Sequence, residues 1–458
     1  MSLTKSLRPG GKHGLSSKES RDPIGFAVAA LNVVAQSPLI DRLGLRKQTE
    51  QAVFTTTRGG FKALGAASRS FARRGAAGKG GVRVPAANPQ HVFDLTPTED
   101  EQMLVDVVTE LATELIRPAA AKADEACAAP AEVLEASLEV GIPTLGVPES
   151  LGGIFEERSA MAGVLVAEAL AKGDLGIGVA TLAPGAVATA LSLWGDEQQQ
   201  QTYLPAFTGE AAQQSVPAAA LALAEPTVLF DALAPATTAR REGEELVLDG
   251  VKSLVPRGAE AELFVVGAQL DGKPVLVIVE SATEGVRVEA DPSMGVRAGA
   301  LTKLHLDGVR VPAANVLGAT DGSTYTECVR LSRLAWCGLA VGTAQAVLDY
   351  VTPYVKEREA FGEPVAHRQS VAFMVANIAI ELQAMRLLTY RAAARAAQGK
   401  DFSREVALAR KACADHGMRI GLDGVQLLGG HGFVKEHPVE RWYRDLRAIG
   451  LAEGAVLV

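Results

Sequence analysis

The sequence predicts a mainly α fold with a central β-domain, built from a helical domain, a small antiparallel β-domain and a C-terminal helical bundle. Apolar residues recur at helical spacing over 93–214, short Val- and Leu-rich runs fill 215–320, and helical spacing returns over 321–458. Residues 1–92 differ in composition and are predicted to be a basic N-terminal extension and linker. A chain of 458 residues is too long for a single core, so several domains are expected.

The extension is strongly basic. Residues 1–90 carry 15 lysines and arginines against 4 acidic residues, a net charge of +11 on a chain whose net charge is −8. The apolar segment 24–38 is too short to cross a bilayer, and 49–76 interleaves apolar and basic residues in an amphipathic helical pattern. A basic arm on an acidic body favours peripheral contact with an anionic membrane. The Arg-rich, acid-poor composition also resembles a transit peptide, so a cytoplasmic location at the inner face of the membrane and a mitochondrial one both remain open.

Patterns for metal sites, disulfides and membrane spans are missing from the sequence. The four cysteines are widely spaced without a C-x-x-C pair, and the seven histidines show no H-E-x-x-H. We therefore expect no metal site, and the cysteines suit a reducing compartment. No run of 18 apolar residues occurs, so no spanning helix is expected. We also expect no nucleic-acid partner.

The folded part is predicted to begin at Thr96. Thr96 would be the N-cap, Pro97 the first helical residue and Glu99 the partner that completes a capping box. Apolar residues then follow at helical spacing: Met103, Leu104, Val107, Val108, Leu111 and Leu115. Helical pattern continues to about residue 214.

The period then changes. Four short Val- and Leu-rich runs, punctuated by Gly, Asp and Pro, predict antiparallel strands at 246–255, 262–270, 273–281 and 303–311. Helical spacing returns from about residue 322. One long helix is predicted to end near Gly399 and to bury a face made of Val371, Met374, Ile378, Leu382 and Met385. Ser403 is predicted to cap the next helix, which would end at Gly429.

The most informative stretch is QLLGGHGFVKEHPVERWYRDLRAIGLAEG, residues 426–454. Gly429 and Gly430 can end a helix and allow another backbone to approach closely. Glu453 stands among the apolar residues Ile449, Leu451 and Val456. A carboxylate buried in such surroundings has a raised pKa, which is what a catalytic base needs. From spacing alone, an exposed glutamate at a frayed terminus is the alternative.

This stretch resembles the C-terminal signature of the acyl-CoA dehydrogenases, flavin enzymes that desaturate acyl thioesters. The resemblance includes the glycine pair, the P-V-E-R run, the Y-R-D and the E-G eight residues after that aspartate. LGVPESLGG at 145–153 and the run 295–318 also resemble family segments. The resemblance covers roughly 93–458 and implies the family's order of helical, β and helical domains.

The resemblance implies a set of site residues. Glu453 would be the base that removes the α-proton of the acyl-CoA, and its backbone N–H would help polarise the thioester. Arg333 would lie near the acyl-CoA, with a helix-surface arginine as the alternative. REAFG at 358–362 resembles the family's R-x-x-F-G, whose Arg and Phe reach FAD bound to a neighbouring subunit; an ordinary interface arginine is the alternative. The residues implied to bind the cofactor are Arg358, Phe361, Gln369, Gln426, Gly429, Gly430 and Gly454.

The β-domain departs from the family pattern. The family's T-E-P-G-A-G-S-D loop is AEPTVLFD here, at 224–231, with bulky residues in place of the glycines. The family's K-x-W-I-T is KSLVP, in which Leu254 replaces the Trp and Pro256 the Thr. Pro256 has neither a backbone N–H nor a hydroxyl to donate. Ala455 follows Gly454 where the family has Thr.

Three functions therefore stand open. The first is an FAD-dependent acyl-CoA dehydrogenase of fatty acid β-oxidation type, a homo-oligomer (dimer or tetramer) that passes electrons to an electron-transfer flavoprotein. The second is a non-catalytic or half-site subunit that completes a partner's FAD site in a hetero-oligomer. It is favoured by the altered β-domain loops. The third is a membrane-targeted scaffold that uses the basic arm.

Overall fold

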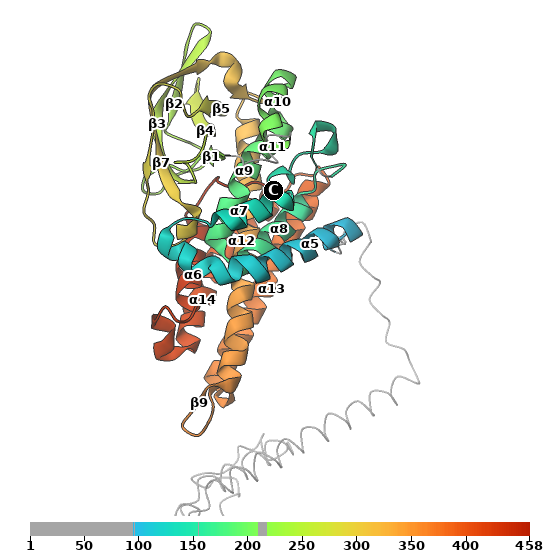
Figure 1. Cartoon of the computed structure of the whole chain (residues 1–458), viewed down its shortest axis with the longest axis vertical. Helices are drawn as coiled ribbons and strands as arrows, with labels where there is room; N and C mark the ends of the chain where they lie inside the picture. Colours follow the sequence, from blue (N-terminus) through green and yellow to red (C-terminus); the bar gives the residue numbers. More distant parts are fainter. Residues whose placement is uncertain (1–94, 96, 154, 209–217) are drawn as a thin grey trace, which may run out of the picture. The chain divides into compact units, whose positions relative to one another are not determined.

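The computed structural model describes residues 95, 97–153, 155–208 and 218–458 (Figure 1). The basic extension, with the predicted amphipathic segments 24–38 and 49–76, lies outside the described residues. The described part has the predicted fold class: a helical domain, a central β-sheet domain and a C-terminal set of long helices.

The N-terminal helical domain begins at a different cap from the one predicted. Thr98 is the N-cap of α5: its hydroxyl accepts from Glu101 N at 3.2 Å, and Glu101 Oε2 accepts from Thr98 N at 3.0 Å. The sequence offers two Thr-x-x-Glu patterns two residues apart, and the later one places Glu99, Asp100 and Glu101 in the first turn, where the helix dipole favours acids. The helices are α5 (Glu99–Leu111), the π-helical η3 (Ala112–Ile116), α6 (Arg117–Ala126), α7 (Ala131–Glu139), the 3₁₀ turns η4 (Ile142–Thr144) and η5 (Glu149–Leu151), α8 (Ala160–Gly173), α9 (Leu175–Trp194), α10 (Glu197–Tyr203) and α11 (Pro205–Thr208).

Among the described residues, the central domain forms an eight-stranded sheet. Its strands are β1 (Ala219–Ala222), β2 (Thr238–Glu242), β3 (Glu245–Pro256), β4 (Leu263–Leu270), β5 (Lys273–Glu280), β6 (Val286–Ala290), β7 (Leu301–Pro312) and β8 (Val316–Leu317). The four predicted strands are present as β3, β4, β5 and β7. Most pairings are antiparallel as predicted, but β4 pairs in parallel with both β1 and β2. The ladder between β3 and β7 shifts register between Lys252 and Val255, where Leu254 has a φ of +55°.

The C-terminal part contains the long helices α12 (Ser323–Glu357), α13 (Gln369–Ala397) and α14 (Ser403–Leu427), and the short helix α15 (Val439–Leu446). Between these helices lie the β9–β10 hairpin (Glu359–Ala360 and Glu363–Pro364) and the 3₁₀ turns η8 (Val365–His367) and η9 (Gly429–Phe433), and the 3₁₀ turn η10 (Arg447–Gly450) follows α15. The β-domain contains two further 3₁₀ turns, η6 (Arg297–Gly299) and η7 (Ala313–Asn315). The predicted face of α13 is confirmed for its buried members Ile378, Leu382 and Met385, while Val371 and Met374 are half-buried.

Ser403 is not the cap of α14. Phe402 occupies the N-cap position without a side-chain cap, and Ser403 is the first helical residue. Asp401 Oδ1 accepts from the backbone N–H of Ser403 at 3.1 Å, so the side-chain acceptor at the start of the helix is Asp401 and not Ser403. The helix ends at Leu427, two residues before Gly429, whose φ is +58°.

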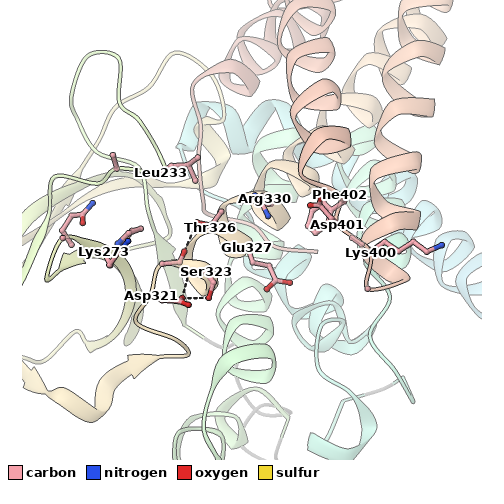
Figure 2. Close-up of a pocket in the computed structure, with 17 residues that line it drawn as sticks. Leu233, Lys273, Asp321, Ser323, Thr326, Glu327, Arg330, Lys400, Asp401 and Phe402 are labelled. Carbon is pink, nitrogen blue, oxygen red and sulfur yellow. Dashed lines mark hydrogen bonds between the residues drawn. The ribbon is translucent and has the colours of Figure 1, made fainter.

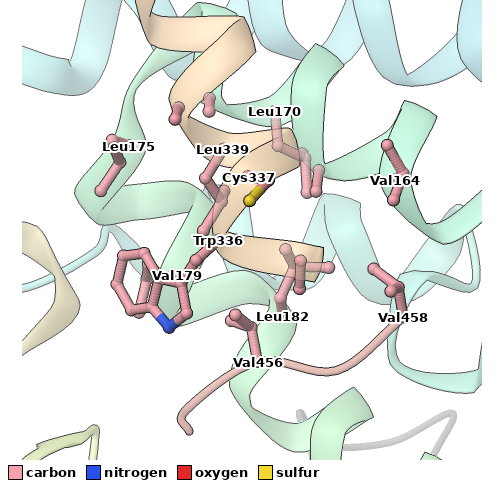
Figure 3. Packing of buried hydrophobic residues seen from close by; sticks show 14 of the residues in the cluster. Val164, Leu170, Leu175, Val179, Leu182, Trp336, Cys337, Leu339, Val456 and Val458 are labelled. Atoms are coloured by element: carbon pink, nitrogen blue, oxygen red, sulfur yellow. The ribbon is translucent and has the colours of Figure 1, made fainter. Parts of the chain in front are cut away.

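Three described helices are long and apolar enough to cross a membrane by length and composition, although the sequence has no run of 18 apolar residues. In their most apolar windows, α9 is 89% buried inside the protein, α12 is 78% buried and α13 is 17% buried. The apolar surface of α9 and α12 therefore belongs to the protein core. Figure 3 shows that core, with Val456 and Val458 of the C-terminal segment among residues of α8, α9 and α12.

A buried ionic cluster ties the sheet to the helices. Arg441 donates to Asp174 at 2.9 Å, Arg444 donates to Asp124 at 2.9 Å, and Asp445 accepts from the backbone N–H of Val296 at 2.6 Å. Burial raises the pKa of Asp445 to about 8, and it also raises the pKa of Asp174. The cluster therefore holds the end of α15, next to the stretch that leads to Glu453, against the β-domain.

Candidate functional site

Glu453 lies three residues beyond the end of η10, and its side chain is 9% exposed. Apolar residues line the cavity beside it, as the sequence suggested, but two arginines that were not predicted as its partners also contact its carboxylate. Its Oε1 accepts from Arg333 Nη2 at 2.9 Å and from Arg410 Nη2 at 3.0 Å, and Arg333 Nε lies 3.1 Å from Oε1 and 3.0 Å from Oε2. Burial disfavours a charged carboxylate, but two guanidinium groups at hydrogen-bond distance stabilise it. The structure thus holds Glu453 as a paired, buried carboxylate.

Arg410 of α14 is a site residue that the sequence interpretation missed. It donates to the carbonyl of Ala452 at 2.9 Å as well as to Glu453, and its Nη1 is buried without a hydrogen-bond partner among the described residues. A signal existed in the sequence. Val406, Arg410 and Cys413 follow helical spacing, so an arginine stands within an otherwise apolar, buried stripe. A buried arginine is expected to pair with a carboxylate. The sequence alone does not show that the partner of Arg410 is Glu453, which comes 43 residues later.

The backbone after Glu453 is fixed by α12. Ser332 Oγ and Trp336 Nε1 both donate to the carbonyl of Gly454, at 3.0 Å and 2.8 Å. Gly454 has a φ of +73°, and a Cβ there would lie 2.9 Å from the side chain of Leu223. Glycine is therefore required at this position. Among the described residues, none accepts a hydrogen bond from the backbone N–H of Glu453.

A small cavity of about 120 Å³ lies beside Glu453. Its walls are mostly apolar and include two arginines: the lining residues are Leu254, Val296, Leu301, Trp336, Leu451, Ala452 and Ala455, together with Arg444 and Arg447. For comparison, an apolar cavity of about 150 Å³ in another protein binds benzene. The space beside Glu453 therefore matches one small apolar group.

Five of the predicted cofactor residues share a second, larger groove of about 600 Å³: Arg358, Phe361, Gln426, Gly429 and Gly430. No atom lies within 4 Å of a Cβ built on either glycine, so their backbone is open to a ligand. Phe361 is 96% exposed at the tip of the β9–β10 hairpin. Gln369 begins α13 next to this groove, which its neighbours Arg368 and Ser370 line.

Within one chain, Arg358 of the groove lies far along α12 from Arg333, the partner of Glu453. Arg358 follows Arg333 by 25 residues, nearly all within α12, which corresponds to about 37 Å along the helix. One dinucleotide cofactor does not extend that far. The predicted residues are thus divided between two places: Glu453, Arg333 and Gly454 at the cavity, and the other cofactor residues at the groove.

A third, polar groove of about 950 Å³ was not predicted (Figure 2). It lies among the β4–β5 turn, the beginning of α12 and the loop between α13 and α14. Its charged lining residues are balanced in sign: Lys273, Arg330 and Lys400 against Asp321, Glu327 and Asp401. Its lining residue Arg330 precedes Arg333, the partner of Glu453, by about one turn of α12.

The residues fit FAD unevenly. The groove of Arg358 offers an arginine and open glycine backbone, which suit phosphate oxygens. At the cavity, the backbone N–H of Leu254 already donates to Asp291 Oδ2 at 3.1 Å, and the volume is that of one ring rather than three fused rings. Val228 and Leu229, in the altered loop, are 88% and 96% exposed. The nucleotide end fits, and the ring system does not fit the cavity in this conformation.

Comparisons with known proteins agree with the fold. The chain matches the descriptions "Acyl-CoA dehydrogenase, N-terminal domain" over 98–210, "middle domain" over 220–309 and "C-terminal domain" over 322–456. It is 31% identical over 365 residues to the mitochondrial short-chain specific acyl-CoA dehydrogenase of Rattus norvegicus, covering 78% of this chain and 87% of the relative. It is 30% identical over 367 residues to a 3-(aryl)acrylate reductase of Clostridium sporogenes, covering 78% and 95%.

Among solved structures, butyryl-CoA dehydrogenase from Megasphaera elsdenii superposes with a TM-score of 0.72 and 26% identity, covering 79% of this chain and 96% of the other. Members of the family and structural relatives bind FAD. Because the three domain matches follow the order of the three structural parts, and relatives of similar length share this fold, the chain belongs to the acyl-CoA dehydrogenase family of oxidoreductases.

Proposed function

We propose that this chain is an FAD-dependent acyl-CoA dehydrogenase of fatty acid β-oxidation type, with Glu453 as the base that removes the α-proton. The observation that carries the proposal is the buried carboxylate of Glu453 at the wall of an apolar cavity. A carboxylate in that place can meet the carbon chain of a thioester, whereas bulk water cannot compete for it. FAD, when bound, supplies the acceptor for the β-hydride.

The two oxygens of Glu453 are not equivalent. Oε1 accepts hydrogen bonds from both arginines, whereas Oε2 receives only the Nε of Arg333. Oε2 therefore has the spare lone pair, and we assign it as the atom that takes the α-proton. Arg333 and Arg410 both donate to the Glu453 carboxylate, and we expect them to orient it. A direct contact of Arg333 with the acyl-CoA stays a prediction.

The rest of the thioester also has a place. The backbone N–H of Glu453, which has no acceptor among the described residues, can donate to the thioester carbonyl and stabilise the charge that develops there. The long polar part of a coenzyme A ester would lie in the polar groove, one turn of α12 away. Electron-transfer flavoprotein as the acceptor, and the cytoplasmic or mitochondrial location, rest on the sequence resemblance and stay predictions.

The groove of Arg358 supports an oligomer. It lies about 37 Å along α12 from Arg333, so the FAD that it contacts would belong to another subunit. In a homo-oligomer, either a dimer or a tetramer, the Arg358 groove of each subunit would contact the FAD held by a neighbouring subunit.

A second function is favoured by the small cavity and the bulky loop at Val228 and Leu229. In this case the chain is a half-site subunit: its groove completes the FAD site of a related partner, while its own β-domain holds little flavin. This second function explains both why the Arg358 groove is intact and why the β-domain loops are altered.

One experiment separates the two functions. The purified chain is assayed for flavin by visible absorption and for dye-coupled oxidation of butanoyl-CoA, with Glu453→Gln as the test and the exposed Glu436→Gln as the matched control. The dehydrogenase proposal expects bound flavin, turnover in the control, and a loss of orders of magnitude in Glu453→Gln. A colourless, inactive chain that regains flavin only with a related subunit would favour the half-site function. Flavin with equal turnover in both variants would reject Glu453 as the base.

A further inference from the structure

The indole of Trp336 closes the cavity beside Glu453 on its helical side. Trp336 is 2% exposed, and it follows Arg333, the partner of Glu453, by one turn of α12. Its Nε1 donates to the carbonyl of Gly454 at 2.8 Å, which fixes the ring in one orientation against the backbone that follows the base. The same residue thus forms a wall of the cavity and anchors the Glu453 segment.

Described residues of α9 and α12 pack together behind this wall. One turn further along α12, Leu339 packs against α9: a Cβ on Gly178 would lie 3.5 Å from Leu339 Cδ2, an ordinary van der Waals distance. The interior of α9 is buried throughout, and Figure 3 shows Trp336, Leu339 and Val179 in the packed cluster between α9 and α12. An acyl chain that meets Glu453 cannot continue between these two helices while Trp336 stays in place.

We propose that Trp336 determines acyl-chain length and restricts the substrate to short acyl thioesters of about four carbons, since the cavity of about 120 Å³ is slightly smaller than one that holds benzene. This inference rests on the proposed function, because it takes the cavity as the place of the acyl group. Trp336 is a specificity residue through its volume, and a positioning residue through its hydrogen bond to Gly454.

The two roles of Trp336 can be separated by two variants. Trp336→Ala removes the ring and opens space toward α9. Trp336→Phe keeps an aromatic wall but loses the N–H that reaches the Gly454 carbonyl. If volume sets the chain length, only the alanine variant should admit longer chains. If the hydrogen bond mattered alone, both variants would behave alike.

The test is equilibrium binding of butanoyl-CoA and octanoyl-CoA by calorimetry, without an electron acceptor, on the full chain. We expect the wild type and Trp336→Phe to bind butanoyl-CoA more tightly than octanoyl-CoA. We expect Trp336→Ala to bind octanoyl-CoA more tightly than the wild type does. Each methylene newly buried is worth about fourfold in affinity, so a gain of about tenfold or more is expected when several methylenes enter. Thermal melting checks the fold, and Trp336→Leu replaces the alanine variant if that one unfolds.

The outcomes are distinct. Equal binding of the two thioesters by the wild type, or an unchanged preference in a folded alanine or leucine variant, overturns the role of Trp336 while the proposed function stands. Failure of the wild type to bind either thioester overturns the proposed function, and the inference with it. A preference that shifts equally in the alanine and phenylalanine variants would show that the cavity volume is not the determinant.

Discussion

Replacing Arg410 with glutamine tests how the buried carboxylate of Glu453 is stabilised. Arg410 is 13% exposed, and it donates to Glu453 at 3.0 Å and to the Ala452 carbonyl at 2.9 Å. A hydrogen bond to a charged group contributes about 1.5–3 kcal/mol, and breaking a buried ion pair from one side costs about 3–5 kcal/mol. Arg333 keeps its contacts to Glu453 in the variant, so we expect a loss of about 2–3 kcal/mol in the free energy of unfolding.

Urea unfolding followed by circular dichroism measures this loss, and Arg404→Gln is the matched control. Arg404 lies on the same helix and is exposed, so its replacement should change stability by less than about 0.5 kcal/mol. Arg410→Gln is then made in the Glu453→Gln background, where no charge needs compensation. The cost of losing Arg410 should fall there by about 1 kcal/mol or more. Arg410 does not stabilise the Glu453 carboxylate in this way if Arg410→Gln costs no more stability than Arg404→Gln, or if its cost is the same in both backgrounds.

Three further predictions follow from the structure. Burial raises the pKa of Asp445 to about 8, above its unfolded value of about 3.9, so the stability that it contributes is full below about pH 4 and is lost as the pH rises through 8. Asp445→Asn should flatten this fall in stability, measured by urea unfolding at a series of pH values. An unchanged dependence of stability on pH would contradict the prediction. Gly454→Ala should cost about 2 kcal/mol or more, because a Cβ there meets Leu223 at a φ of +73°, whereas Gly450→Ala, with its nearest contact at 3.6 Å, should cost far less; equal melting temperatures would contradict the account. The basic extension should bind anionic liposomes in a salt-sensitive way, with about 1 kcal/mol from each basic residue near the surface. After sedimentation with liposomes, a chain that lacks residues 1–90 should therefore stay in the supernatant. If the shortened chain pellets with liposomes to the same extent as the full-length protein, the extension is not the membrane-binding part.

The fold could be predicted from the sequence because its signals are local. Period 3.6 and period 2 alternate in long blocks, and strands β3, β4, β5 and β7 appear where they were expected. Two local details were wrong because neighbouring residues compete for one role. Thr98 rather than Thr96 caps α5, and Asp401 rather than Ser403 supplies the acceptor at the start of α14. The parallel pairing of β4 with β1 and β2 could not be read from any single strand.

The sequence predicted several residues of the candidate site, but it did not predict how they are arranged in space. The family-like motifs named Glu453 and Arg333, and the structure brings them within 2.9 Å. Arg410 and the balanced polar groove were missed, because their meaning depends on helices that meet only in the fold. The separation of Arg358 from Glu453 is set by the length of α12, which a list of motif residues does not reveal.

Anaerobic mixing of the purified chain with butanoyl-CoA tests the central claim most directly. If Glu453 takes the α-proton, the visible band of the bound flavin should bleach in the wild-type chain and in Glu436→Gln, since removal of the proton allows transfer of the hydride. In Glu453→Gln the band should persist, although the thioester binds. Bleaching of Glu453→Gln at the wild-type rate would contradict the account.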